Sequence, residues 1–467
     1  MNGRRGAYLL GEGGFGLTAV LHTLTAVLWG PPTMALFLGT GIYFTVRSRF
    51  FQCRAGTIVR GTLGCKRQTG TQEGALSPVR TLSTALGACM GTGNIAGVGT
   101  ALTVGGAGAL FWMCVSAFFG MMTAFAETVL AVHFRDKDAD GRRAGGAMYV
   151  LEKGLAMRRA ARIYAFLLAA SSFGVGNMAQ VNASASALRT AFGIPAVRTG
   201  AVFCVLVALT VCGGVRRIGA VTEKAVPLLS GIFLLCAVGA LWHCRAQIPT
   251  ALREIFVGAW NFRAAAGGLA GQAVRVGVTR GVFSNEAGLG STAVIHAAAD
   301  TDSPVGQGLW AILEVFLDTV LMCTVTGLVI LTSGVHDPSA DGAALFAQSL
   351  GVTFGRAGSA LTAVTLSLLG FASVTGWSYC GERGTAYLFG SRAIPVYRAL
   401  YAAAAFFGSF LRLDTVFRIS DVLNCLMALP NLLSLWLLSG IVFAHLRTYK
   451  ENPICQYYPY PKKEDRT

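Results

Sequence analysis

The stretch that decides the fold reads MGTGNIAGVGTAL, from Met90 to Leu102. Its residues Gly91, Gly93 and Ala96 fit the G-x-G-x-x-G/A pattern of a dinucleotide-binding loop. Such a loop follows a β-strand, opens a helix and has an acidic residue about 20 positions further on. Here RTLSTALGACM precedes the glycines, a long apolar run follows them, and the next acid is Glu127. The match to the dinucleotide pattern is therefore accidental.

The composition indicates a membrane protein. The chain has 467 residues, of which 54% are hydrophobic and 13% charged, and its mean hydropathy is +0.57. Soluble domains carry about 25% charged residues. The net charge of +16 does not indicate nucleic-acid binding, because the Lys and Arg residues lie between apolar runs. We find no catalytic triad or metal cluster, so we expect neither an enzyme nor a cofactor.

Eleven segments are apolar and long enough to cross a bilayer, which requires about 20 residues per helix. An all-α integral membrane bundle with about eleven transmembrane helices follows. The predicted spans are Trp29–Val46, Val79–Val104, Ala107–Val132, Ile163–Leu188, Val197–Val215, Ile218–Trp242, Gly267–Ile295, Gly306–Leu331, Ala357–Leu388, Ile394–Leu411 and Thr415–Leu446.

Basic residues predict the orientation. They recur in the first loop, in the loop two spans later, before the sixth span and in the tail; examples are Arg47, Arg60, Arg135, Arg143, Arg217 and Lys450. The positive-inside rule places these segments in the cytoplasm. We therefore expect a multi-pass protein of the cell membrane with its N-terminus outside and its C-terminus inside.

The glycines of the opening stretch lie near the middle of a predicted span. They can mark a broken helix whose unwound backbone lines a cavity, or a surface for close helix packing. A second mid-span stretch, VFSNEAGLGST from Val282 to Thr292, also combines glycines with an asparagine and adds Glu286. Two interrupted spans in corresponding positions of two halves indicate a transporter binding site.

Each break opens a set of five spans. Because five is odd, the two sets insert with opposite topology, as in the inverted repeats of secondary transporters. We expect an N-terminal segment (1–78) with one extra span and a basic loop, a first half (79–243), a second half (244–446) and a cytoplasmic tail (447–467).

Other polar residues lie inside spans. Glu314 and Asp318 share one helix face, and they can coordinate an ion or carry a proton, or belong to a structural network with hydroxyls, Arg275 or Arg280. Gln180 can bind a polar ligand or join helices. The oxygens of Ser373 and Thr375 suit a hard monovalent cation.

Seven ordered motifs resemble the sodium:alanine symporter family, and together they cover nearly the whole chain. They are WGPPTMALFLGTGIYFT, GTGNIAGVGTALTVGGAGALFWM, FAETVLAVHFR, GGAMYVLEKGL, NEAGLGSTAVIHAAA, QGLWAILEVFLDT and GWSYCGER. The resemblance implies the leucine-transporter fold, a five-plus-five inverted repeat behind one extra N-terminal span. It also implies cotransport of small amino acids with sodium, which spacing alone does not show.

The resemblance also implies a site. Thr92 and Gly93 match the broken segment that holds the substrate carboxylate, and Gln180 matches a polar side chain facing the ligand. The matching pocket walls are Phe283, Ser373 and Trp377, and the positions expected near sodium are Gly91, Asn94 and Thr375. The span Val79–Val104 has no acid, so the substrate amine would rely on backbone carbonyls, Gln180 or Glu286.

These observations predict a sodium-coupled symporter that imports small neutral amino acids, such as alanine or glycine, by alternating access. Its expected partners are the amino acid, sodium and the lipid bilayer. The alternative is a proton-coupled carrier or antiporter that uses Glu286, Glu314 or Asp318 as its relay. The sequence assigns no oligomeric state.

Overall fold

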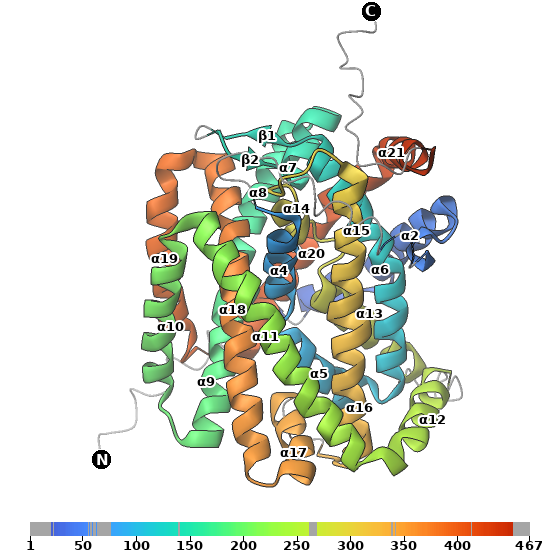
Figure 1. The fold of residues 1–467 in the computed structure, drawn as a ribbon, viewed down its shortest axis with the longest axis vertical. Coiled ribbons are helices and arrows are strands. Elements are labelled where there is room, and N and C mark those ends of the chain that lie inside the picture. The colour runs from blue at the N-terminus through green and yellow to red at the C-terminus, as the bar shows by residue number, and fades with distance from the viewer. Residues whose placement is uncertain are drawn as a thin grey trace, which may run out of the picture.

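The computed structural model describes residues 20, 21, 23–54, 56, 58, 62, 76–138, 141–260, 269–337, 340, 342–411 and 413–451. These residues form a helical bundle (Figure 1) with one short antiparallel ribbon, in which β1 (Asp136–Lys137) pairs with β2 (Arg143–Ala144). The basic residues expected between 63 and 75 and beyond residue 451 lie outside the described residues.

The helices follow the predicted order of spans. The first five predicted spans correspond to α2 (Pro31–Ser48), the pair α4 (Pro78–Cys89) and α5 (Val98–Gly105), α6 (Gly108–His133), the pair α8 (Arg158–Phe173) and α9 (Ala179–Phe192), and α10 (Ala196–Val211). The next five correspond to α11 (Gly214–His243), the pair α13 (Leu269–Asn285) and α14 (Ser291–His296), the pair α15 (Pro304–Val315) and α16 (Thr324–Ser333), α18 (Ala357–Phe389) and α19 (Ile394–Gly408).

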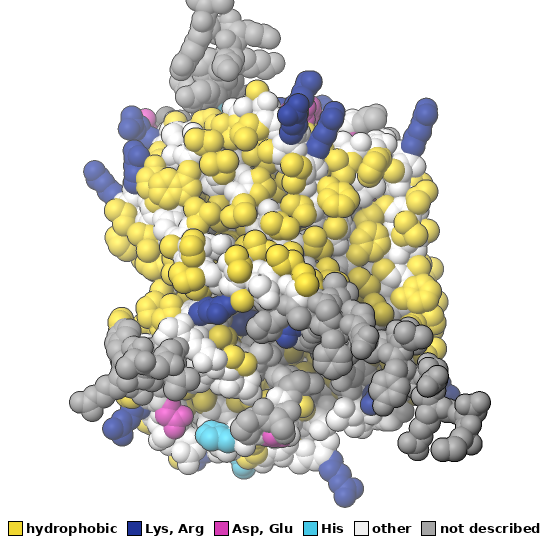
Figure 2. Space-filling view, turned by 180° about the vertical axis from the view of Figure 1, so that it is seen from behind, with side chains coloured by type: hydrophobic (Ala, Val, Ile, Leu, Met, Phe, Trp, Pro, Cys, Tyr) yellow, Lys and Arg dark blue, Asp and Glu magenta, His cyan; other side chains and the backbone are white. Residues whose placement is uncertain are grey.

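Hydropathy and length single out five of these segments as helices able to cross a membrane. They are Gly108–His133, Gly214–His243, Pro304–Ser333, Ala357–Phe389 and Val416–Leu437. Several other predicted spans consist of shorter helices, among them α4, α5, α10 and α19. Figure 2 shows the resulting surface, a broad band of hydrophobic side chains with Lys and Arg gathered toward its two ends, as a bilayer requires.

The first break separates α4 from α5. Helix α4 begins at Pro78, where the Ser77 hydroxyl accepts a hydrogen bond from the Arg80 backbone N–H, and it ends at Cys89. Met90 then leaves the helical region with ψ of 90°, and a π-helical segment (Gly93–Gly97) leads into α5. The glycine-rich stretch is therefore an interrupted membrane helix rather than a nucleotide loop.

The second break separates α13 from α14. Glu286, Gly288 and Gly290 have φ values of 55°, 98° and 76°, so the chain turns through the left-handed region three times. Only glycine adopts this region without strain, and Glu286 is held there by its surroundings. The Glu127 carboxylate accepts a hydrogen bond from the Gly288 N–H at 3.0 Å.

The last predicted span, Thr415–Leu446, is wrong at its end. Helix α20 (Leu413–Leu437) ends nine residues earlier, at Leu437. A separate helix, α21 (Ser439–Glu451), then continues in a different direction (Figure 1). Helix α21 packs against α6 and α15 and carries His445, Arg447 and Lys450. Its polar residues explain why it does not continue the span, although its first residues are apolar.

The β1–β2 ribbon is attached to the end of the bundle where α14 and α18 finish. Arg143 of β2 forms an ion pair with Asp300 at 3.2 Å, and Arg383 of α18 forms one with Asp138 at 2.7 Å. Outside the membrane-spanning segments, the hydrogen bond from Lys153 lowers the pKa of Asp136. These ion pairs hold the ribbon against this end of the bundle.

Helix α17 (Gly342–Phe354) packs directly on α5 through two glycines. A Cβ placed on Gly99 would lie 2.8 Å from the Gly342 carbonyl carbon, closer than real side chains approach backbone. We expect Gly99→Ala to lower the melting temperature of the purified protein, since overpacking costs about 1–3 kcal/mol.

The matched control is Gly231→Ala in α11, where a Cβ meets nothing within 4 Å. It should be neutral or stabilising, because alanine favours a helix by about 1 kcal/mol over glycine. Equal melting temperatures for the two variants would contradict the packing role of Gly99.

Candidate functional site

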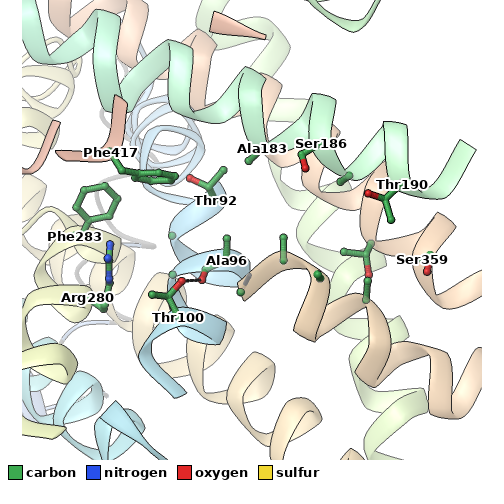
Figure 3. A pocket seen from close by; sticks show the side chains of 18 residues that line it. Thr92, Ala96, Thr100, Ala183, Ser186, Thr190, Arg280, Phe283, Ser359 and Phe417 are labelled. Atoms are coloured by element: carbon green, nitrogen blue, oxygen red, sulfur yellow. Dashed lines mark hydrogen bonds between the residues drawn. The ribbon is translucent and has the colours of Figure 1, made fainter. Parts of the chain in front are cut away.

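A cavity of about 430 Å³ lies against the first break (Figure 3). Three of the predicted substrate residues line it: Thr92, Gly93 and Phe283. Figure 3 shows Phe283, Phe417 and Arg280 together at one end of the cavity, with Thr190 and Ser359 toward the other. The remaining walls come from α5, α9, α17 and α18 and consist mostly of small residues. A compact polar ligand fits such a space.

The backbone of the first break presents hydrogen-bond donors to an oxygen ligand. In this structure the Thr92 N–H donates to Gln180 Oε1 at 2.9 Å, and Gln180 Nε2 donates to the Val175 carbonyl at 3.1 Å. The Thr92 hydroxyl is buried and has no hydrogen-bond partner among the described residues. A carboxylate oxygen in the position of Gln180 Oε1 would accept the same bond from Thr92.

The other predicted pocket walls, Trp377 and Ser373, do not line this cavity. Trp377 is buried, and its indole N–H donates to Glu286 Oε1 at 2.8 Å. The Ser373 hydroxyl donates to the Ala88 carbonyl at 2.8 Å, which places it between α18 and α4. The Thr375 hydroxyl donates to Phe371 in its own helix.

Asp318 joins the two breaks. Its Oδ1 accepts a hydrogen bond from the Asn94 amide at 2.8 Å, and its Oδ2 accepts one from the Ser284 hydroxyl at 2.7 Å. Asn94 follows the first break and Ser284 precedes the second. The Thr319 hydroxyl also donates to Oδ2. The carboxylate is fully buried, and within the described part of the chain no Lys, Arg or His forms an ion pair with it.

Glu314 lies one turn earlier and has different partners. Its Oε2 lies 2.6 Å from His296 Nε2, and its Oε1 accepts a weak hydrogen bond from the Cys89 thiol at 3.3 Å. Gln307 contacts the other ring nitrogen of His296 at 2.7 Å. Arg275 and Arg280, the arginines suggested as partners, form no ion pair with either acid among the described residues, whereas hydroxyl partners, also suggested, are present at Asp318 in Ser284 and Thr319.

Sequence reasoning missed the residues that fix the second break. The Asn431 amide donates to both Glu127 and the Gly288 carbonyl, and the Tyr164 hydroxyl donates to the Leu289 carbonyl. It also missed Cys89, Ser284, His296 and Gln307. Each of these residues is a polar side chain inside an apolar span, which the sequence shows. Which of them lie in contact is known only from the fold.

A model of one protein family matches residues 15–460, and its description is the sodium:alanine symporter family. The chain belongs to the sodium:alanine symporter family. It is therefore a membrane transporter that couples amino-acid movement to sodium, and not an enzyme. The predicted family and function are confirmed.

Related proteins are similar in sequence to this chain over nearly their full lengths. The sodium/alanine symporter AgcS of Methanococcus maripaludis is 41% identical over 93% of this chain and 97% of its own. The probable sodium/glutamine symporter GlnT of Bacillus subtilis is 35% identical over 91% of this chain and 88% of its own. The putative sodium/proton-dependent alanine carrier protein YrbD of Bacillus subtilis is 32% identical over 92% of this chain and 91% of its own.

Two solved structures confirm the fold class. MhsT in complex with L-phenylalanine superposes with a TM-score of 0.60 at 14% identity, covering 80% of this chain and 93% of MhsT. A sodium-coupled sialic acid symporter gives a TM-score of 0.51 at 14% identity, covering 90% of this chain and 86% of the symporter. The predicted leucine-transporter fold is thus correct.

Gly93 tests whether the first break is a ligand site. Gly93 lines the cavity, and a Cβ on it would be 3.5 Å from the Ser284 Cα, an ordinary contact that leaves room for a methyl group. We expect Gly93→Leu to abolish sodium-dependent binding of radiolabelled alanine, measured by scintillation proximity, while the protein stays monodisperse.

Gly93→Ala is the matched control and should retain binding, because its methyl group fits. Normal alanine affinity in a monodisperse Gly93→Leu protein would exclude a ligand site here. Loss of monodispersity in both variants would show that Gly93 serves helix packing.

Proposed function

We propose that this chain imports alanine, glycine or an amino acid of similar size together with sodium, at a site between the two helix breaks. The observation that carries the proposal is the fully buried Asp318 carboxylate, which touches both broken helices and has no cationic partner among the described residues. A buried charge is costly unless it is paired. A sodium ion supplies the missing positive charge.

The substrate carboxylate binds the donors of the first break. The backbone N–H groups at Thr92 and Gly93 lie at the start of a helical segment, where the helix dipole favours an anion. The carboxylate replaces Gln180 Oε1 as the acceptor of the Thr92 N–H. The freed Gln180 oxygen then accepts a hydrogen bond from the substrate ammonium group, so one side chain serves the empty and the occupied site.

Sodium binds oxygen atoms around Asp318. Ser284 and Thr319 place hydroxyl oxygens within hydrogen-bond distance of this carboxylate, the Asn94 amide nitrogen donates to it, and hard cations prefer oxygen ligands. Gly91 belongs to the same segment, because its N–H donates to Asn94 Oδ1 at 3.2 Å. Ser373 and the Ala88 carbonyl, close to Thr375, form a second group of oxygens between α18 and α4.

The two halves, 79–243 and 244–446, alternate the access to this site. We assign the β1–β2 ribbon and α21 to the cytoplasmic side, which puts the N-terminus outside and the C-terminus inside. One sodium ion that enters through 100 mV releases about 2.3 kcal/mol. Since about 1.4 kcal/mol corresponds to a factor of ten, the membrane potential alone supports roughly 50-fold accumulation.

Proton coupling is the second candidate, and the His296–Glu314 contact favours it. Both side chains are buried, and the contact of 2.6 Å can hold a proton between them. Alanine uptake into proteoliposomes distinguishes the candidates, because a sodium gradient drives the first and an acidic exterior drives the second.

Asp318 and Glu314 provide a matched pair of variants. We expect Asp318→Asn to raise the sodium concentration for half-maximal alanine uptake at least about tenfold, since it removes the charge that attracts the ion. Glu314→Gln should change this concentration much less, because His296 already pairs with Glu314. Sodium titrations of uptake measure both, and equal effects would contradict the sodium role of Asp318.

Trp377 should limit the size of the substrate. The indole packs against Gly176 and contacts Glu286, so it closes the space beside the second break. We expect Trp377→Ala to take up leucine, which the parent excludes, and Trp377→Phe to keep the parental size limit. Competition of unlabelled amino acids with labelled alanine measures the ranking. An unchanged ranking in an active Trp377→Ala protein would refute the pocket assignment.

A further inference from the structure

The ends of α2 and α21 meet at a corner of the bundle that the proposed transport mechanism does not use (Figure 1). The Phe443 ring of α21 stacks on Phe44 of α2, with the ring centroids 5.5 Å apart. The Tyr43 hydroxyl lies 3.0 Å from the Ser439 hydroxyl, which also joins the two helices. The last helix of the described chain is therefore docked on the first predicted span.

Lys450 of α21 is held over the end of α2. Its ammonium group donates to the Ser48 carbonyl at 3.2 Å and lies over the Phe51 ring, 5.6 Å from the ring centroid. Burial lowers the pKa of this ammonium group, and the charges of Arg54 and Arg49 lower it further. Three cations therefore lie close enough to repel one another.

Arg47 adds a fourth positive charge. Its guanidinium lies over the Phe443 ring, 4.9 Å from the ring centroid. Among the residues that the structure describes, no Asp or Glu forms an ion pair with Arg47, Arg49, Arg54 or Lys450, which we call the basic cluster. Like charges gathered without a counter-charge attract an anion from outside the chain.

An exposed apolar row on α2 leads to the basic cluster. Ile42 and Val46 are 41% and 57% exposed, and they are four residues apart, so they lie on one face of the helix. Phe50, which follows the end of α2, is 49% exposed. A bilayer covers such side chains with its acyl chains. The apolar row and the cationic end of α2 thus follow each other in the order of a lipid, with an acyl chain first and then a headgroup.

We propose that the basic cluster binds the headgroup of an anionic phospholipid, whose acyl chains lie along Ile42 and Val46. Phosphate oxygens accept paired hydrogen bonds from guanidinium groups. The rings of Phe443 and Phe51 hold two of the cations in place. A zwitterionic lipid brings an additional cationic group that the four charges repel, so the net charge of the headgroup decides binding.

This site goes beyond the transport function. It rests on that proposal only in the assignment of α21 to the cytoplasmic side, where anionic lipids give the membrane surface a negative potential. A bound headgroup neutralises the repulsion within the basic cluster. The lipid therefore holds α21 against α2, and it stabilises the folded protein because it binds the folded state.

The experiment uses the purified full-length protein, delipidated in a non-ionic detergent. Native mass spectrometry measures the binding of dioleoylphosphatidylglycerol, which is anionic, and of dioleoylphosphatidylcholine, which is zwitterionic and carries the same acyl chains. Glycerol 3-phosphate, which carries a phosphate without acyl chains, is added as a competitor. The variants are Arg47→Gln, Lys450→Gln and the two changes combined.

Arg245→Gln is the matched control. The Arg245 guanidinium also lies over an exposed aromatic ring, that of Trp242, 5.3 Å from its centroid. It precedes α12 (Ile248–Ala259), at the opposite end of the bundle from α21 (Figure 1). The control therefore removes one exposed cation and its contact with a ring without touching the basic cluster.

We expect the parent to bind phosphatidylglycerol at least about tenfold more tightly than phosphatidylcholine. Each single variant should weaken phosphatidylglycerol binding about fivefold and the combined variant about 25-fold, since one Lys or Arg near an anionic surface contributes about that factor. Arg245→Gln should bind it like the parent. Phosphatidylglycerol should raise the melting temperature of the parent and not that of the combined variant.

Equal affinities of the parent for the two lipids would overturn the proposal, and so would parental phosphatidylglycerol binding in the combined variant. An equal loss in Arg245→Gln would show a general effect of surface charge. Displacement of the lipid by an equimolar amount of glycerol 3-phosphate would show a site for soluble phosphate compounds instead. If the combined variant is not monodisperse, the two single variants decide. Because the titration contains neither sodium nor alanine, it stays informative if the proposed transport function fails.

Discussion

Backbone that leaves the helical conformation inside a membrane must find new hydrogen-bond partners, and this requirement organises the whole structure. At the first break, Gln180 satisfies the Thr92 N–H. At the second, Glu127 and Asn431 satisfy the N–H and carbonyl of Gly288. These side chains come from α6, α9 and α20, so each break is supported by helices distant in sequence. The polar residues of the bundle core are there because the helices are broken.

The same side chains create the ligand chemistry. A donor that a glutamine can satisfy can also be satisfied by a carboxylate of the right size, which is why we propose the unwound backbone as the binding site. The acids divide by their partners: Glu127 supports backbone, Glu314 faces His296, and Asp318 meets hydroxyl and amide groups without a cation in the described residues. We propose an external cation at Asp318, because its two oxygens contact residues of both broken spans. One type of residue thus serves three functions, which its neighbours determine.

The order of the helices and the position of both breaks could be predicted from the sequence, because mid-span glycines weaken a helix and the carboxylate in NEAGLG needs polar partners inside the membrane. The partners of Glu314 and Asp318 could not, since they depend on which helix faces meet; Asn94 and Asp318, for example, are more than 200 residues apart. Trp377 lies beside the second break and Ser373 beside the end of α4, so neither lines the cavity. The end of the last span was wrong because α21 begins with residues as apolar as those of α20, and hydropathy does not report a change of direction.

The contact between Gly99 and Gly342 also constrains how the transporter moves. Two backbones in direct contact cannot slide without steric overlap, so α5 and α17 behave as one rigid body. Rotation of the first broken span is then confined to the three residues between α4 and the π-helical segment, Met90 to Thr92. The hinge of the transport cycle would then coincide with the backbone that we propose to hold the ligand, and a substrate that orders this backbone would also fix the angle between the two half-helices.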